Sequence, residues 1–291
     1  MKLNWQASAM VSCLHAAEAW LRTPARIDPA LARALATPVG ALQAMLQEEG
    51  VVPDSFWSQV VPLAAGILSL HELTIVTLTK VMGRAQALPR AARICGLLGD
   101  VKNAFLGAVS HPDTETVSAR AALPQRWSYR GQKLLSRVVA WTDPGILVDE
   151  ATIIMVFPVL GGGGSAHLPY NSVHIETVPV DPHVGLPEVL RLAWLLSALN
   201  LDLPRYCENL RPNRLTQIAG LAMVPVILTA ATELGLECPI SKRLGQAIEE
   251  WVGSPEKAEA WADILRVWWE SYRTVRPAWA TALQALDRLL P

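Results

Sequence analysis

The stretch between residues 152 and 200 limits the fold most, because only there do the residues clearly favour β-structure. An unbroken apolar run, Thr152–Leu160, precedes four glycines and a second strand-like run, Ser172–Val180. An apolar run without alternation is typical of a strand that is covered on both faces. The nearly all-apolar segment Pro187–Asn200 then predicts an interior helix. We therefore expect two antiparallel strands, joined by the glycine-led loop 161–171 and covered by helices.

The rest of the sequence has the apolar periodicity of helices, interrupted by prolines. Met10 and Leu14 begin a series of apolar residues at helical spacing, which places an amphipathic helix close to the N-terminus. The run Leu73–Met82 is rich in β-branched residues, but its apolar positions continue a helical pattern, so we expect a helix there. Thr37-Pro38 is expected to break a helix, because proline lacks the backbone N–H that the helix needs.

Together these patterns predict a mainly α-helical, bundle-like protein with a small central β-hairpin or sheet inserted, which is an α+β arrangement. The expected organisation is an N-terminal helical section (1–145), a β-hairpin with its glycine-rich loop (146–186) and a C-terminal helical section (187–291). We expect the three sections to share one compact domain, because a hairpin alone is marginal in water and needs helices to cover it.

The balance of charged and apolar residues bears on the class of partner. Charged residues make up 18% of the sequence and apolar residues 51%, whereas about 25% charged is typical of soluble domains. A large helical core would explain this balance, and so would apolar surface that contacts a protein partner or a second copy of the chain. The net charge is −1, and no run of more than two adjacent basic residues occurs. Nucleic acid is therefore not expected as a partner, since phosphate binding needs a basic surface.

Cysteine spacing and apolar segments indicate where the protein resides. The four cysteines are widely spaced and form no CxxC pair, so a thiolate zinc site has no support and a reducing cytoplasm is the simplest location. The N-terminus lacks the apolar centre of a signal peptide. Residues 215–232 carry no charge and approach the length of a membrane-spanning helix. Because Gly220 and Pro225 lie within them, we expect a buried, kinked core helix instead of a membrane span.

The glycine-led loop is the candidate ligand-binding site. It lacks the Gly-Lys-Ser/Thr of a phosphate-binding P-loop and is followed by a strand instead of a helix, so nucleotide binding is not expected. Glycine allows positive φ angles, and mobile loops often bind ligands. The predicted ligand-binding residues are Gly162, Gly163, Gly164, Ser165, His167, Tyr170 and Asn171.

Imidazole and carboxylate groups around the second strand suggest a metal ion as a possible cofactor. His167, His174 and Glu176 are the candidate ligands, with His183 nearby in the sequence. These groups suit zinc and similar ions, provided that the loop folds back over the hairpin. Against this, the six residues between the two histidines do not form the tight spacing that anchors most metal sites. The alternative is histidines that are individually hydrogen-bonded or exposed.

A covered hairpin followed by a buried helix is similar in order to the zincin peptidases. Those enzymes carry His-Glu-x-x-His on that helix, where two imidazoles bind zinc and the glutamate activates water. At the corresponding place this chain has Arg191-Leu192-Ala193-Trp194-Leu195-Leu196, without histidine or glutamate. The resemblance therefore implies a non-catalytic relative.

An aromatic stripe near the C-terminus has the composition of an interface. Trp261, Trp268, Trp269 and Tyr272 fall on one side of a predicted helix, with arginines nearby. Tryptophan, tyrosine and arginine are enriched at interface hot spots, and core packing is the other interpretation of the stripe.

The leading functional hypothesis is a non-catalytic, soluble binding or assembly protein with a protein partner or a homo-oligomeric state. It rests on the low charge and on the missing catalytic motifs. The alternative is a metal-dependent, hydrolase-like enzyme, or a degenerate zincin-like relative, with its site at the glycine-rich loop. A third hypothesis is peripheral membrane association through residues 215–232 or the C-terminal helix.

Overall fold

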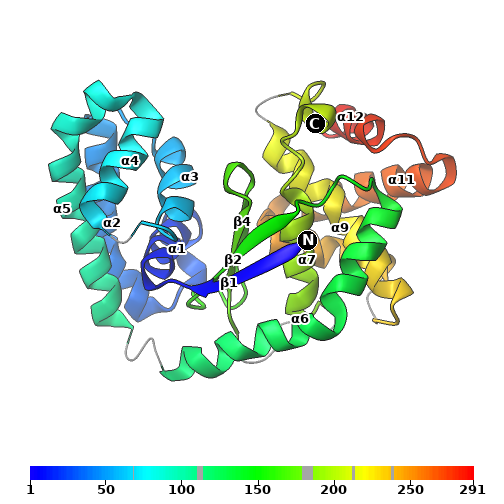
Figure 1. The fold of residues 1–291 in the computed structure, drawn as a ribbon, viewed down its shortest axis with the longest axis horizontal. Helices are drawn as coiled ribbons and strands as arrows, with labels where there is room; N and C mark the ends of the chain where they lie inside the picture. The colour runs from blue at the N-terminus through cyan, green and yellow to red at the C-terminus, as the bar shows by residue number, and fades with distance from the viewer. Residues whose placement is uncertain (68, 110–113, 179–185, 212–213, 237–238) are drawn as a thin grey trace.

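The computed structural model describes residues 1–67, 69–109, 114–178, 186–211, 214–236 and 239–291 (Figure 1). The N-terminal half comprises β1 (Lys2–Ala7), α1 (Ala9–Arg22), the 3-10 turn η1 (Pro24–Arg26), α2 (Pro29–Glu48), α3 (Pro53–Leu63), α4 (Leu70–Met82) and α5 (Arg84–Ala108). The middle comprises α6 (Thr114–Trp141), β2 (Glu150–Val156), β3 (Gly164–His167), the 3-10 turn η2 (Leu168–Tyr170) and β4 (Ser172–Glu176). The C-terminal half comprises α7 (Glu188–Ala198), α8 (Pro204–Cys207), α9 (Leu215–Glu233), α10 (Ile240–Ala247), the π-helical turn η4 (Ile248–Val252), the 3-10 turn η5 (Pro255–Lys257), α11 (Ala258–Val275) and α12 (Trp279–Leu289).

The predicted class is confirmed, because the structure is mainly helical with one small mixed sheet. The strand order is β1-β2-β4-β3, in which β1, β2 and β4 are parallel and β3 is antiparallel to β4. The expected antiparallel pairing of the two apolar runs is therefore wrong, since Thr152 on β2 lies beside Ser172 on β4 in parallel register. The physical reason is the glycine-led segment, which passes the end of β4 and adds β3 at the far edge before the chain turns back.

The sheet separates two hydrophobic cores, one in each helical half (Figure 1). Alternate residues of β2 face opposite cores: Ile153 belongs to the C-terminal core and Ile154 to the N-terminal core. On β4, Val173 and Ile175 face the C-terminal core. His174 and Glu176 alternate with them and therefore face α1.

The boundary predicted at residue 145 does not follow the packing. Helix α6 runs below the sheet from one half to the other (Figure 1), and its Trp127 and Leu134 belong to the C-terminal core. Strand β1, which the sequence analysis did not anticipate, pairs with β2 through its whole length. The N-terminal half therefore depends on residues of the central section, and the C-terminal core begins within α6.

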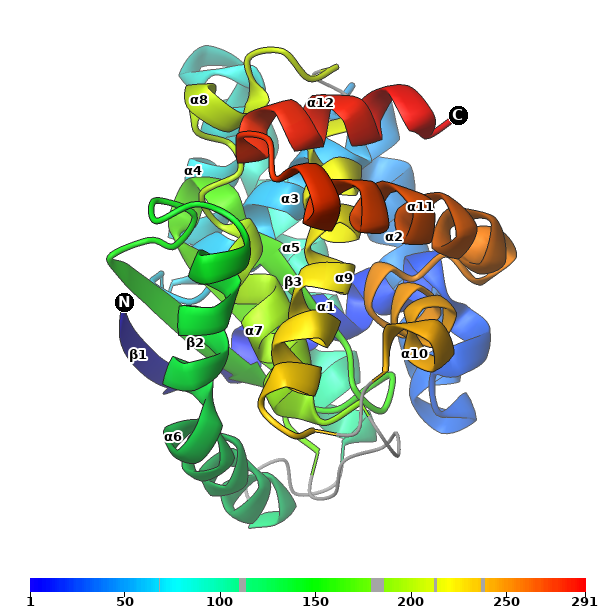
Figure 2. The same cartoon turned by 90° about the vertical axis from the view of Figure 1, so that its right-hand side faces the viewer.

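Helices α7 and α9 form the interior of the C-terminal half, and α11 and α12 lie across α9 (Figure 2). Every residue of α7 is buried, which confirms the interior helix that its apolar run predicts. Among the described residues, α9 is the one helix long and apolar enough to cross a membrane, and 72% of its most apolar window is buried inside the chain. A buried core helix has the same length and composition, so this finding by itself is weak support for a membrane span.

Two local expectations had opposite outcomes. Helix α4 is confirmed over Leu70–Met82, and the hydroxyl of Ser69 accepts the N–H of Glu72 at its start. The break expected at Pro38 is wrong, because α2 continues through it to Glu48. Its apolar stripe is buried on both sides of the proline, and this packing offsets the one backbone hydrogen bond that the ring removes.

The aromatic stripe of α11 also needs correction. Trp261, Trp268, Trp269 and Tyr272 are at most 5% exposed and belong to the C-terminal core. Their polar atoms bind inside the chain: Trp269 donates to Thr229 at 2.9 Å and Tyr272 donates to the carbonyl of Trp141 at 2.7 Å. The interpretation of these residues as an interface is therefore replaced by core packing.

Candidate functional site

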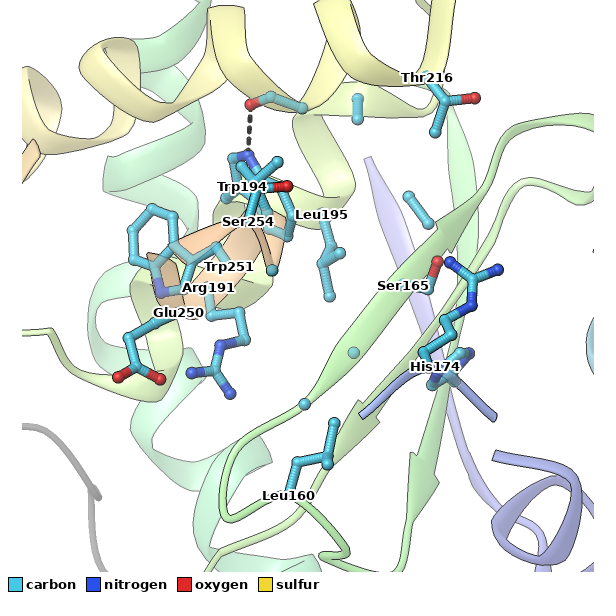
Figure 3. Close-up of a pocket in the computed structure, with 18 of the residues that line it drawn as sticks. Leu160, Ser165, His174, Arg191, Trp194, Leu195, Thr216, Glu250, Trp251 and Ser254 are labelled. Atoms are coloured by element: carbon cyan, nitrogen blue, oxygen red, sulfur yellow. Dashed lines mark hydrogen bonds between the residues drawn. The ribbon is translucent and has the colours of Figure 1, made fainter. Parts of the chain in front are cut away.

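A cavity of about 580 Å³ lies between the two helical halves, beside the edge strand β3 (Figure 3). Its wall combines α1 and η1 from the N-terminal half, β3 and His174 from the sheet, and α7, α9, η4 and the residues Gly253 and Ser254 that follow it from the C-terminal half. This volume lies within the range of small-molecule sites, roughly 300–1,000 Å³. The cavity is the place where both halves and the glycine-led segment meet.

One face of α7 forms the inner wall of the cavity. Arg191, Trp194, Leu195 and Ala198 all line it, and their spacing of three and four residues places them on one side of the helix. The indole N–H of Trp194 donates to the carbonyl of Gly220 on α9 at 2.8 Å, which fixes the ring. The face therefore presents one cation, one aromatic ring and aliphatic surface in a row.

The π-helical turn η4 continues this wall beside α7 (Figure 3). Glu250, Trp251 and Val252 line the cavity from this turn, and the ring of Trp251 lies 5.8 Å from that of Trp194. Single π-helical turns occur frequently at functional sites. At the mouth, Arg26 of η1 contacts Glu250 at 3.3 Å, so an ion pair joins the two halves.

Behind the glycine-led segment, the carboxylate of Glu176 collects five hydrogen bonds. The donors are Nε2 of His15 at 2.7 Å and the backbone N–H groups of Val159, Leu160, Gly162 and Gly163 at 2.9, 2.8, 2.6 and 2.8 Å. A segment that crosses the end of a strand has no neighbouring strand to accept its N–H groups, and buried N–H groups need a partner. Glu176 supplies that partner and shapes the cavity wall.

The electrostatics of Glu176 follow from these contacts. Burial by itself raises the pKa of a carboxyl, but the hydrogen bond and charge interaction with His15, together with the N–H groups of Gly163 and Gly162, outweigh it. The net effect lowers the pKa of Glu176 to about 2. The group is therefore a fixed anion at neutral pH, with both oxygens in use.

His167 and His174 lie together, as the metal hypothesis requires. Nε2 of His167 is 2.8 Å from Nδ1 of His174, and the His15 ring lies 4.8 Å from that of His174 between centroids. Burial, with a smaller contribution from His15, lowers the pKa of His167 to about 4. Burial, followed by His15 and His167, lowers the pKa of His174 well below its ordinary value. The two imidazoles are therefore neutral at pH 7 and share one hydrogen bond.

The predicted metal ligands are thus only partly assembled. The two imidazoles meet, but the carboxylate of Glu176 is bound by His15 and by the crossing segment. No group of three or more His, Cys, Asp and Glu side chains that could hold a metal ion occurs in the described part of the chain. His183, which lies near these three ligands in the sequence, is outside the described residues.

The predicted ligand-binding residues separate into two groups. Gly163, Gly164 and Ser165 line the cavity. The remaining ones do not, namely Gly162, His167, Tyr170 and Asn171. Tyr170 lies against the N-terminal half instead, where its hydroxyl donates to Gln59 and the Lys80 ammonium lies 5.4 Å from its ring.

Several cavity residues were not predicted as site residues, among them His15, Arg191, Trp194 and Trp251. A signal for Arg191 was present, because it is the one charged residue in the apolar run 189–199. His15 and Trp251 lie far from the glycine-led loop in sequence, and only the tertiary structure brings them to it.

Arg191 is an unusual residue within this wall. It is 2% exposed, and Nη1 lies 3.3 Å from the carboxylate of Glu188, one turn earlier on α7.

No family model, curated protein or solved structure matches the chain. The function is therefore inferred from the geometry of the cavity.

Proposed function

We propose that this protein is a non-catalytic binding protein that holds a small, largely apolar molecule in the cavity between its helical halves. The observation that carries the proposal is the paired aromatic wall, Trp194 on α7 and Trp251 on η4, in a cavity of about 580 Å³. Small-molecule sites are typically concave, mostly apolar and supplied with a few fixed polar groups. The cavity has this composition.

The polar groups of the site are held in place before any ligand arrives. Because Glu176 N–H donates to the carbonyl of Gly163 at 2.9 Å, Gly163 directs its backbone groups toward β4. In antiparallel pairing the next residue directs its groups the other way, so Gly164 and Ala166 direct theirs away from β4, on the cavity side. A ligand with one amide or hydroxyl group finds hydrogen-bond partners on this edge.

Ligand titration tests the proposal. The neutral probe 4-phenylbutyramide is added to the full chain, and binding is followed by tryptophan fluorescence and by ligand-observed NMR. We expect saturable binding, because Trp194 and Trp251 both line the site. Thr216 is exposed at the cavity wall on α9, and Thr216→Trp should weaken binding at least tenfold by filling the space.

The matched control is Val267→Trp on α11, because Val267 is 67% exposed and does not line the cavity. This variant should bind the probe like the wild type. Equal binding by the wild type and Thr216→Trp, or no saturable binding by the wild type, would overturn the proposal.

The other hypotheses have their own tests. Assembly with a partner or a second copy predicts discrete oligomers in light scattering, although the aromatic stripe proposed for that role is used by the core. The metal-dependent hydrolase predicts stoichiometric metal in elemental analysis. Membrane association predicts that the protein sediments with liposomes.

A further inference from the structure

Arg191 is a buried cation at the wall of the cavity. Its Nε, Nη1 and Nη2 are shielded from water, and none of them has a hydrogen-bond partner within the described part of the chain. A guanidinium carries five N–H donors, and leaving buried donors unsatisfied costs stability. The contact with Glu188 at 3.3 Å balances the charge of Arg191, and its geometry within the described structure is that of an ion pair without a hydrogen bond. An unsatisfied buried group at a cavity wall points to an absent partner.

The position of Arg191 defines where that partner binds. The side chain lines the cavity from α7 and lies against the glycine-led segment. A Cβ atom at Gly162 would come within 2.5 Å of Nη1, and Gly162 has φ +131°. Only glycine leaves this space and adopts this backbone conformation readily, so the segment is fitted around the guanidinium.

We propose that Arg191 binds the carboxylate of an amphipathic monocarboxylate, whose apolar body lies against Trp194 and Trp251; this rests on the proposed function. Glu188 contacts Nη1 of Arg191, so the edge formed by Nε and Nη2 is available to the ligand. In guanidinium–carboxylate pairs this edge donates two parallel hydrogen bonds to the carboxylate. A ligand with a second negative charge is disfavoured, because Glu188 lies only 3.3 Å from the same guanidinium.

The face of α7 also sets the length of the ligand. Trp194 and Leu195 lie one turn beyond Arg191, and Ala198 lies two turns beyond it. At 1.5 Å per residue, the distance from Arg191 to Ala198 along the axis is about 10 Å. An aryl- or alkyl-carboxylate of about this length places its charge at Arg191 and its body on the aromatic wall.

The test compares 4-phenylbutyrate with its neutral isostere 4-phenylbutyramide on the full-length wild type by isothermal titration calorimetry. We expect the carboxylate to bind at least tenfold more tightly. Equal affinity for the two probes would overturn the anion subsite while leaving the cavity as a binding site. Binding of neither probe would overturn the proposed function and this inference together.

Variants locate the effect at Arg191. Arg191→Met should abolish the preference for the carboxylate, so that the two probes bind with equal affinity. Because this variant leaves Glu188 buried beside an apolar side chain, the double variant Glu188→Gln/Arg191→Met serves as the folding-matched form, checked by circular dichroism. A carboxylate preference retained by a folded double variant would overturn the assignment.

Discussion

Replacing Glu176 by glutamine should loosen the glycine-led segment more than any other conservative change in the site. Glutamine keeps one acceptor oxygen and replaces the other with an NH₂ group. With its oxygen toward His15, Val159 and Leu160, the NH₂ group faces the N–H groups of Gly162 and Gly163, so donor meets donor. Two hydrogen bonds to a charged acceptor are lost, at about 1.5–3 kcal/mol each, which amounts to about 3–6 kcal/mol.

The pKa of Glu176 leads to a similar magnitude. Its shift from 4.5 in an ordinary glutamate to about 2 in the folded protein corresponds to about 3 kcal/mol of folding stability. Because the folded pKa is the lower one, this stability is present above pH 4.5 and is lost as the pH falls toward 2. At pH 7 the wild type has all of it, and Glu176→Gln should have none.

Urea unfolding at pH 7 and hydrogen exchange of the peptide spanning residues 157–164 measure the effect. Glu176→Gln should lower the free energy of unfolding by about 3 kcal/mol or more and remove the exchange protection of Gly162 and Gly163. The matched control is Glu150→Gln, because Glu150 is an exposed acid on the same sheet, bound to Asn4 and Lys2; its free energy of unfolding should stay close to that of the wild type. A Glu176→Gln protein within 1 kcal/mol of the wild type, with its loop still protected, would refute the role given to this carboxylate.

Three further predictions concern the same region. His167, whose pKa is lowered to about 4, and His174, whose pKa burial also lowers well below its ordinary value, are neutral in the folded protein. Stability should therefore fall as the pH drops below about 6.5 toward 4, by about 3 kcal/mol for His167 alone, and urea titrations at pH 7.5 and 4.5 measure this change. Gly162→Ala should destabilise the protein by about 1–3 kcal/mol, because φ at Gly162 is +131° and the new Cβ would clash with Arg191. Its control is Gly40→Ala, in open space within α2, which should stabilise the protein by up to about 1 kcal/mol. The melting temperatures of the two variants, compared with that of the wild type, test this prediction. Elemental analysis of protein purified without chelator should find no stoichiometric metal if the site is non-catalytic, and one equivalent per chain would favour the hydrolase hypothesis.

The features of the fold that local patterns determine could be predicted from the sequence. The run Thr152–Leu160 has the composition of a doubly covered strand, and its part within β2 is buried from Ile153 to Val156. The segment Pro187–Asn200 has the composition of an interior helix, and every residue of α7 within it is buried. The parallel pairing of β2 with β4 could not be predicted, because it depends on where the chain goes between them. Strand β1 was missed since a short edge strand at a terminus produces little apolar signal.

The site was harder to predict than the fold, because its members come from distant segments. Of the ligand-binding residues predicted from the glycine run, Gly163, Gly164 and Ser165 line the cavity. Glu176 was assigned to a metal, whereas its oxygens satisfy backbone N–H groups that appear only once the segment crosses β4. Arg191 stood out in its apolar run, but its meaning depends on the cavity beside it.

Strand β1 has a consequence for how the polypeptide matures. Its partner begins at Glu150, which is 148 positions downstream of Lys2, so at about 5–20 residues per second a ribosome needs roughly 7–30 s to synthesise it. During that interval the hydrophobic core of the nascent N-terminal helices lacks Ile154 and Val156 and is incomplete. A fragment truncated after residue 145 would keep this incomplete core permanently. We expect such a fragment to be bound by chaperones or degraded instead of accumulating as a folded domain.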